Sequence, residues 1–99
     1  MQAPLSPETI EASLKTLPGW QFQDDQLKKT FLFNSFPEAM SFMVRVGFEA
    51  EQHNHHPEFF NVYNRVVIGL STHDAGNKVT DKDLQLANTI ETVNWLTPE

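Results

Sequence analysis

The order of helix-start signals and turns constrains this chain more than any other feature of its sequence. Ser6-Pro7 sets a capping serine before a proline at the first helical position, and Pro18-Gly19 ends the run that follows. Ser35 and Glu38 have the spacing of a capping box, and Thr80 precedes an acidic first turn. The sequence therefore predicts three helices, with room for two strands in each interval between them.

Apolar residues at helical spacing give each predicted helix a face to bury. The stripes are Ile10, Leu14 and Leu17 in the first helix, Met40, Met43, Val44 and Gly47 in the second, and Leu86, Ala87, Ile90 and Val93 in the third. A helix with one apolar stripe needs a second layer to cover it. We expect a sheet to form that layer.

Each interval between the helices holds two strand-like runs separated by a turn. The first interval predicts strands over Trp20–Gln23 and Leu27–Phe33. The second predicts strands over Phe59–Tyr63 and Val66–His73, joined at Asn64, because Asn tolerates the positive φ of tight hairpin turns. Short connections make paired strands antiparallel. We therefore expect an α+β fold in two layers, ordered α-β-β-α-β-β-α, with a four-stranded antiparallel sheet and three helices on one face.

Length and composition narrow the classes of function. A chain of 99 residues supports one core, so we expect a single domain over residues 1–99. Seven scattered basic residues against thirteen acidic ones give a net charge of −6, which argues against nucleic-acid binding. The lack of cysteine excludes thiol chemistry, and no apolar run is long enough to span a membrane. We expect a cytoplasmic protein without nucleic-acid or membrane partners.

All four histidines lie within one short stretch of the sequence. His53, His55 and His56 form a single run, and Pro57 requires the preceding helix to end by His55, because a residue before proline is pushed out of the α region. His73 ends the strand expected to pair with the one that follows Pro57. The predicted topology can therefore bring His73 to the end of the sheet where the run lies.

Three interpretations of this histidine cluster compete. In the first, the imidazoles are only solvated side chains of a polar loop. In the second, His55 and His73 bind zinc with Glu51 or Asp83, although no HExxH pair supports such a site. In the third, the imidazoles act as general acids and bases, with Glu51 and Asp83 as the carboxylates that orient them. The third suits a reaction in which a proton is delivered to a leaving hydroxyl.

Aromatic residues follow the histidine run. On the predicted strand, Phe59 and Tyr63 share one face and Phe60 points to the other. Core packing is the ordinary explanation for such residues, and stacking against a flat heterocycle is the alternative.

The segment from Glu51 to Asn64 resembles the signature of the pterin-4a-carbinolamine dehydratase family. That signature consists of an acid, three residues, His-His-Pro, an aromatic residue, a further His and an Asp. The matching positions are Glu51, His55, His56, Pro57, Tyr63, His73 and Asp83. Similarity in Met43–Val46 and Leu84–Glu91 extends the resemblance over nearly the whole chain. The loop between His73 and Asp83 is longer than is usual in the family.

The resemblance implies a reaction as well as a fold. The family removes water from 4a-hydroxy-tetrahydropterin, which aromatic amino acid hydroxylases release, and forms quinonoid dihydropterin for recycling. It uses no metal or organic cofactor and assembles as a homodimer or homotetramer. By resemblance, the catalytic residues are His55, His56 and His73, where His55 and His73 form the acid–base pair and His56 mainly holds the pterin ring. The residues expected to bind or orient substrate are Glu51, Pro57, Tyr63, Ser71, Thr72 and Asp83. His53 matches no signature position and is expected to be a bystander.

The resemblance also leaves other functions open. Vertebrate members of the family act as dimerisation cofactors of a homeodomain transcription factor, which they bind through a helical surface. A protein-binding module is therefore one alternative. A dehydratase-like domain that serves another pterin, or that acts as a folding factor, is a further one.

Overall fold

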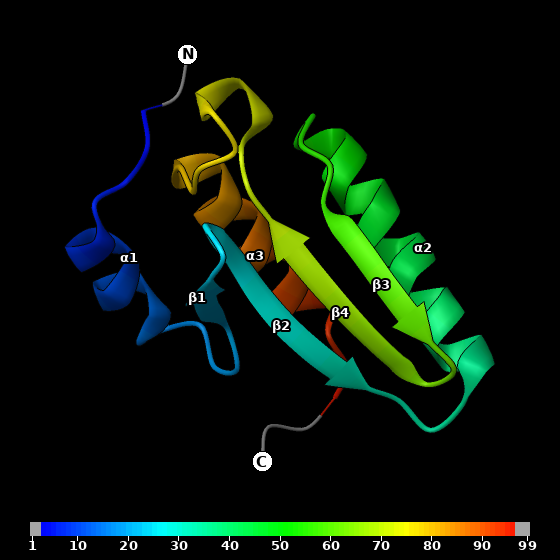
Figure 1. The fold of residues 1–99 in the computed structure, drawn as a ribbon. Coiled ribbons are helices and arrows are strands. Elements are labelled where there is room, and N and C mark those ends of the chain that lie inside the picture. The colour runs from blue at the N-terminus through cyan, green and yellow to red at the C-terminus, as the bar shows by residue number, and fades with distance from the viewer. Residues whose placement is uncertain (1–2, 97–99) are drawn as a thin grey trace.

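One four-stranded antiparallel sheet, formed in the order β1 (Gln21–Gln23), β2 (Gln26–Leu32), β4 (Arg65–Leu70) and β3 (Glu58–Val62), carries the helices on one face (Figure 1). The computed structural model describes residues 3–96, so residues 1–2 and 97–99 of the expected domain lie outside the described residues. The elements are α1 (Pro7–Leu14), β1 (Gln21–Gln23), β2 (Gln26–Leu32), α2 (Phe36–Gln52), β3 (Glu58–Val62), β4 (Arg65–Leu70), the 3-10 helix η1 (His73–Ala75) and α3 (Asp81–Val93). The predicted fold class and order of elements are confirmed.

Side chains cap the three α-helices at the predicted residues. Ser6 accepts a hydrogen bond from the backbone N–H of Thr9 at 3.2 Å, and Ser35 accepts one from Glu38 at 3.3 Å. Thr80 begins α3 with a full capping box. These bonds satisfy N–H groups that have no partner inside the helix.

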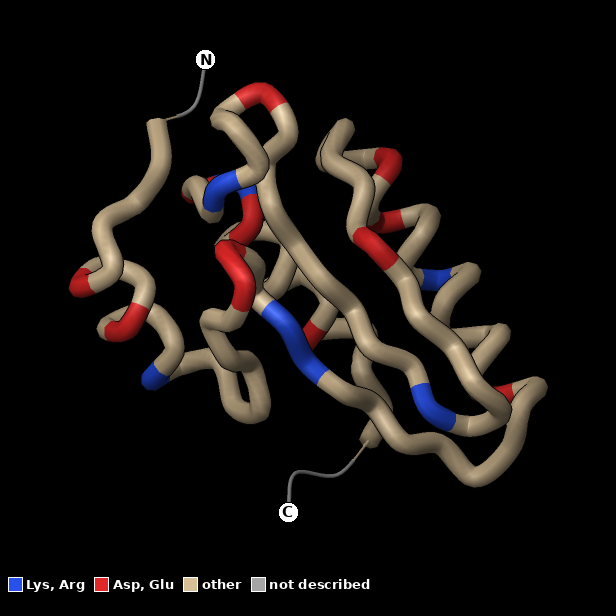
Figure 2. Tube along the Cα trace, in the orientation of Figure 1, with Lys and Arg blue, Asp and Glu red and all other residues tan. Residues whose placement is uncertain are grey.

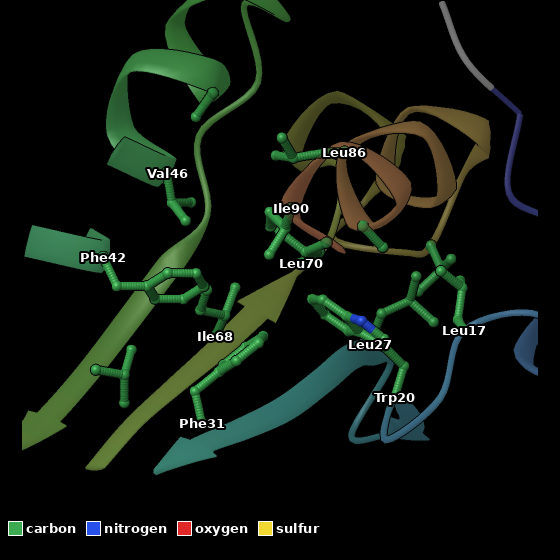
Figure 3. Close-up of a cluster of buried hydrophobic side chains, with 14 of the residues drawn as sticks. Leu17, Trp20, Leu27, Phe31, Phe42, Val46, Ile68, Leu70, Leu86 and Ile90 are labelled. Atoms are coloured by element: carbon green, nitrogen blue, oxygen red, sulfur yellow. The ribbon is translucent and has the colours of Figure 1, made fainter. Parts of the chain in front are cut away.

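The core lies between the sheet and helices α2 and α3 (Figure 3). Leu27 and Phe31 of β2 and alternate residues of β4 point toward the helices. The buried stripes are Ala39, Phe42, Val46 and Ala50 on α2, and Leu86, Ala87 and Ile90 on α3. The α3 stripe was predicted, with Val93 half-buried against the core.

The predicted α2 stripe was wrong, because this helix has two apolar faces. Met40 and Val44 are exposed, and Met43 only packs against the edge of the core. The exposed apolar residues of α2 recur every four positions, at Phe36, Met40, Val44 and Phe48. Spacing alone could not decide which face meets the sheet. The larger side chain of Phe42, which contacts Phe31, occupies the space over β2.

Two details of the second hairpin also differ from the prediction. Strand β4 ends at Leu70, because Thr72 bridges to Lys78 and its carbonyl accepts the N–H groups of Ala75 and Asn77. His73 therefore starts η1 instead of ending a strand.

At the hairpin turn, the positive φ of 52° belongs to Tyr63 and not to Asn64. The Asn64 side chain is needed elsewhere, since it donates to the carbonyl of Phe33 at 2.8 Å. The sequence placed the turn correctly and assigned its left-handed residue wrongly.

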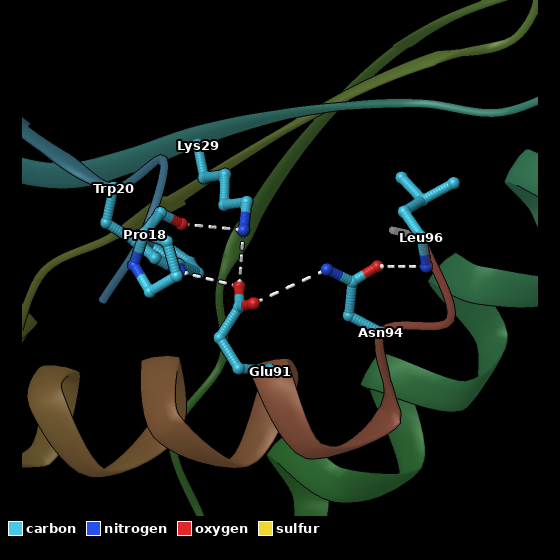
Figure 4. Close-up of polar contacts among 6 residues, drawn as sticks. All are labelled: Pro18, Trp20, Lys29, Glu91, Asn94 and Leu96. Carbon is cyan, nitrogen blue, oxygen red and sulfur yellow. Dashed lines mark hydrogen bonds and ion pairs between the residues drawn. The ribbon is translucent and has the colours of Figure 1, made fainter. Parts of the chain in front are cut away.

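A half-buried polar cluster ties the N-terminal segment to the last helix (Figure 4). The Glu91 carboxylate accepts hydrogen bonds from Trp20 Nε1 and Lys29 Nζ, both at 2.8 Å. Lys29 also donates to the carbonyl of Pro18 at 2.8 Å. The cluster links α3, β2 and the segment after α1. Of the helices between residues 3 and 96, none has the length and apolar character needed to cross a bilayer.

Candidate active site

The candidate site lies at the end of the sheet where β3 begins and β4 ends (Figure 1). Glu58 pairs with Gly69 in this antiparallel pair of strands. The residues just before β3 and just after β4 therefore leave the sheet at the same end. Figure 2 shows acidic positions on the last turns of α2, the start of β3 and the η1 loop, so negative charge predominates around this end.

The turn after α2 directs His55 into the protein. His53 forms the C-cap of α2, and Asn54 adopts a positive φ of 49°. The backbone N–H of His55 then donates to the carbonyl of Ala50 at 3.1 Å. Asn is one of the few residues that adopt this conformation at low cost after a helix, so Asn54 is the sequence signal for the turn.

His55 and Asp83 form the buried centre of the site. The imidazole Nε2 of His55 lies 2.5 Å from Oδ1 of Asp83, and the Asp83 side chain is fully buried. Oδ2 of Asp83 accepts hydrogen bonds from the Thr72 hydroxyl at 2.9 Å and from the backbone N–H of Thr80 at 2.8 Å. A buried carboxylate is stable only when hydrogen bonds replace its hydration, and these donors supply them.

The second ring nitrogen of His55 has no hydrogen-bond partner among residues 3–96 and reaches the surface. Over this range, every buried side-chain nitrogen or oxygen has a hydrogen-bond partner. Within the described part of the chain, the His55 side chain makes a single hydrogen bond, through Nε2. Nδ1 is therefore accessible from outside, in a residue whose exposed fraction is only 8%. A fixed imidazole with one accessible nitrogen can exchange a proton with a bound molecule.

The other two predicted imidazoles are exposed. Nε2 of His56 lies 2.9 Å from Oε1 of Glu51, in a pair whose side chains are 67% and 77% exposed. His73 is exposed on η1, and its Nδ1 lies 3.3 Å from the side-chain oxygen of Asn77. Both imidazoles belong to segments at the same end of the sheet as His55. The sequence pattern further predicts that these three imidazoles line one small hollow able to admit a flat bicyclic ring, and this stays a prediction.

Of the other predicted site residues, Pro57 and Ser71 lie at this end and Tyr63 does not. Pro57 directly precedes β3 and Ser71 directly follows β4. Tyr63 follows the far end of β3, and the six residue steps from Pro57, at about 3.3 Å each, put the two roughly 20 Å apart. Tyr63 is 62% exposed there. Within one chain it therefore does not meet the imidazoles.

Two polar residues have roles that the sequence did not predict. The Thr80 hydroxyl lies 2.6 Å from that of Thr72 inside the site, although Thr80 was recognised only as a helix cap. His53 lies 2.9 Å from the Thr89 hydroxyl and so joins α2 to α3. His53 thus has a structural contact, and the expectation that it takes no part in the chemistry stays a prediction.

The zinc interpretation finds no support in the arrangement of side chains. Within the part of the chain that the structure describes, no group of three His, Asp or Glu side chains is placed to hold a metal ion. His55 and Asp83, two of the proposed ligands, bond to each other. The carboxylate-oriented imidazole fits the acid–base interpretation better.

Comparison with known proteins leads to the same family as the signature. The family model for pterin 4 alpha carbinolamine dehydratase matches residues 3–93. A protein of Opitutus terrae, provisionally named pterin-4-alpha-carbinolamine dehydratase, is 54% identical over 92 residues, which is 93% of this chain and 95% of that protein. A similarly named protein of Christiangramia forsetii is 44% identical over 93 residues, covering 94% of this chain and 95% of its own length.

A solved structure agrees as well. The crystal structure of a transcriptional coactivator/pterin dehydratase from Brucella melitensis superimposes with a TM-score of 0.85 at 36% identity, over 91% of this chain and 97% of that one. Signature, family model, relatives and fold coincide over almost the full length, and the chain belongs to the pterin-4-alpha-carbinolamine dehydratase family.

Proposed function

We propose that this protein removes water from a 4a-hydroxy-tetrahydropterin to give quinonoid dihydropterin, by general acid–base catalysis with histidines. The observation that carries the proposal is the buried His55–Asp83 pair with Nδ1 of His55 left accessible. Membership of the family supplies the substrate class. In this role the protein would return the pterin released by an aromatic amino acid hydroxylase to a reducible form.

The chemistry needs only two proton transfers. In the carbinolamine, the leaving hydroxyl shares its carbon with a ring nitrogen whose electron pair can expel it. One group protonates the oxygen, the C–O bond breaks and water departs, and a second group accepts the proton lost from the ring system. In the proposed reaction His55 accepts the ring proton at Nδ1, and the exposed His73 delivers the proton to the hydroxyl. We assign His56 to holding the pterin, with Glu51 as its orienting carboxylate.

Alanine variants of the two histidines test the proposal. We expect His55→Ala and His73→Ala each to slow dehydration of a freshly generated 4a-hydroxypterin by about 10² to 10⁴-fold, the range for a positioned acid or base. The matched control is His53→Gln, which keeps a polar partner for Thr89 and should leave the rate unchanged. Wild-type rates in both alanine variants, followed by absorbance of the quinonoid product, would remove the catalytic assignment.

We also propose that the protein assembles as a homodimer or homotetramer. The exposed apolar stripe of α2 supports this, because Phe48 is 67% exposed and Val44 is 54% exposed on a small monomer. A second apolar surface lies on β3, the edge strand, where Phe60 and Val62 are exposed. Phe48→Glu should lower the molar mass measured by light scattering while circular dichroism stays unchanged. An unchanged mass would exclude α2 from the interface.

A protein-binding role is the second candidate. The similar protein of Brucella melitensis is named a transcriptional coactivator as well as a pterin dehydratase. The same α2 stripe would suit a partner's amphipathic helix. The two functions separate cleanly, since Phe48→Glu should abolish partner binding and leave the dehydration rate intact, whereas His55→Ala should do the reverse. Two other roles would give different results. Action on another pterin would be detected as turnover of a substrate that no hydroxylase releases, and a folding factor would show chaperone activity without any pterin.

A further inference from the structure

We propose that Thr72 and Thr80 are positioning residues, whose paired hydroxyls hold the Asp83 carboxylate aimed so that His55 carries a proton on Nε2 and exchanges protons only at Nδ1. The inference deepens the proposed function and rests on it only for the step in which substrate meets Nδ1. Neither hydroxyl has direct access to the pterin in this arrangement, because both threonines are buried.

The two hydroxyls and the carboxylate form one continuous chain of hydrogen bonds. The backbone N–H of Lys82 donates to Thr80 Oγ1 at 3.2 Å, and the two threonine oxygens lie 2.6 Å apart. Thr72 Oγ1 lies 2.9 Å from Asp83 Oδ2. The chain therefore runs from the start of α3, through the two hydroxyls, to the carboxylate behind His55.

Only one direction of these bonds uses every proton. Each hydroxyl carries a single hydrogen, and the amide of Lys82 can only donate. If Thr80 donates to Thr72 and Thr72 donates to Asp83, each hydroxyl gives one bond and accepts one. If Thr72 donated to Thr80 instead, Oδ2 of Asp83 would have to be protonated in order to donate to Thr72. The backbone N–H of Thr80, however, already points its hydrogen at Oδ2. The geometry thus favours the carboxylate, which accepts at both oxygens.

The arrangement sets the tautomer of His55. With Oδ2 occupied by Thr72 and Thr80, the remaining oxygen Oδ1 faces Nε2 of His55 at 2.5 Å. A carboxylate oxygen can only accept, so Nε2 must hold the proton. In the neutral ring Nδ1 is then the free base, and it is the nitrogen that reaches the surface.

The same two threonines flank the loop that carries His73. Thr72 precedes η1 and its N–H donates to the carbonyl of Lys78 at 2.8 Å, while Thr80 follows the loop as the N-cap of α3. The 2.6 Å contact between their hydroxyls closes the base of this loop. Loss of the contact should therefore affect the support of His55 and the position of His73 together.

Substitution of Thr72 gives the test, because valine has the shape of threonine without its hydroxyl and serine restores the hydroxyl. We expect Thr72→Val to lower kcat for 4a-hydroxypterin dehydration by about tenfold to a hundredfold with little change in KM. Loss of a hydrogen-bond partner that orients a functional histidine in metal sites has an effect of this size. Thr72→Ser should recover most of the rate. Thr30→Val, at an exposed position of β2, is the matched control and should behave as wild type.

A second readout does not depend on catalysis. In ¹⁵N-labelled protein, imidazole ¹H–¹⁵N correlations should show His55 as the Nε2–H tautomer with a proton that exchanges slowly with water. We expect exchange about tenfold faster or more in Thr72→Val, which corresponds to one hydrogen bond to a charged group. Thr80→Ser, which keeps both the cap and the hydroxyl, should leave exchange slow.

The outcomes separate the inference from the proposed function. An Nδ1–H tautomer in the wild type, or wild-type exchange in Thr72→Val, would overturn the inference whatever the protein catalyses. A Thr72→Ser variant as impaired as Thr72→Val would also overturn it, because packing and not the hydroxyl would then be responsible. If the wild type dehydrates no pterin but shows the expected tautomer and exchange, the proposed function fails and the positioning role of the threonines stands.

Discussion

Replacing Asp83 by Asn changes the central contact of the site at nearly constant volume. The carboxylate accepts three hydrogen bonds, whereas an amide offers one oxygen and one NH2 group. Two of the donors, the Thr72 hydroxyl and the Thr80 backbone N–H, converge on the same oxygen, so we expect the amide oxygen to stay there. The NH2 group would then face His55, whose Nε2 must accept a hydrogen bond instead of donating one.

The structure gives the size of the effect. Three hydrogen bonds to a charged oxygen become bonds to a neutral amide, and each loses roughly 1 kcal/mol, so the free energy of unfolding should fall by about 2 to 4 kcal/mol. The neutral imidazole of His55 should now carry its proton on Nδ1, the nitrogen expected to act as the base. In another enzyme, replacing the aspartate that orients a catalytic imidazole with asparagine holds the ring in the wrong tautomer and lowers kcat by about 10⁴. We expect a loss of about 10² to 10⁴ here.

Three measurements on one preparation check this prediction. Urea unfolding gives the change in stability, ¹H–¹⁵N correlations give the tautomer of His55, and absorbance of the quinonoid product gives kcat. Asp81→Asn is the matched control, since Asp81 lies exposed in the same first turn of α3, where its carboxylate accepts a hydrogen bond from Gln85. An Asp83→Asn protein with wild-type kcat and the proton still on Nε2 would refute the reasoning.

Three further predictions concern the fold. Phe42→Ala should lower the unfolding free energy by about 3 to 5 kcal/mol, because the ring is fully buried, and Phe42→Leu should cost clearly less by urea titration. Lys29→Met should lower the unfolding free energy by about 1 to 3 kcal/mol, since Lys29 holds Glu91 in the half-buried cluster. Lys28→Met should be near neutral because its ion pair is exposed, and equal urea midpoints for the two variants would contradict this. Tyr63→Asn should raise the thermal midpoint, with a gain of about 0.5 to 1 kcal/mol, because Asn tolerates a φ of 52° better than Tyr; a lower midpoint would mean that Tyr63 contributes contacts that outweigh its strain.

The fold could be predicted because its signals are local. The helix starts are predicted by three capping residues, Ser6, Ser35 and Thr80. Each accepts a hydrogen bond from a backbone N–H two or three positions later, and the structure contains those bonds. Turn residues and strand alternation likewise depend on near neighbours. Choices made by distant packing were missed. The buried face of α2 depends on contact between Phe42 and Phe31, which no spacing rule contains.

The candidate site was predictable only in part for the same reason. The sequence places His55, His56 and Asp83 in a recognisable pattern, but it does not say which carboxylate meets which ring. The contact between Thr80 and Thr72 was not predicted, because the role of Thr80 as a helix cap already explains why a threonine stands at this position. The sequence does contain a signal for it. Thr80 caps a helix whose third residue, Asp83, is the carboxylate expected to orient a histidine.

The different burial of adjacent His55 and His56 follows from the extended backbone before Pro57. Neighbouring side chains on an extended segment point to opposite sides, so one ring turns inward to Asp83 and the other outward to Glu51. In the proposed reaction His55 exchanges the ring proton at Nδ1, whereas His56 holds the pterin. Burial beside Asp83 fixes the first ring in place, and exposure leaves the second ring open to a bound molecule. The left-handed Asn54 and the following proline therefore do more than end a helix, because they give two adjacent imidazoles the distinct environments that these two proposed roles require.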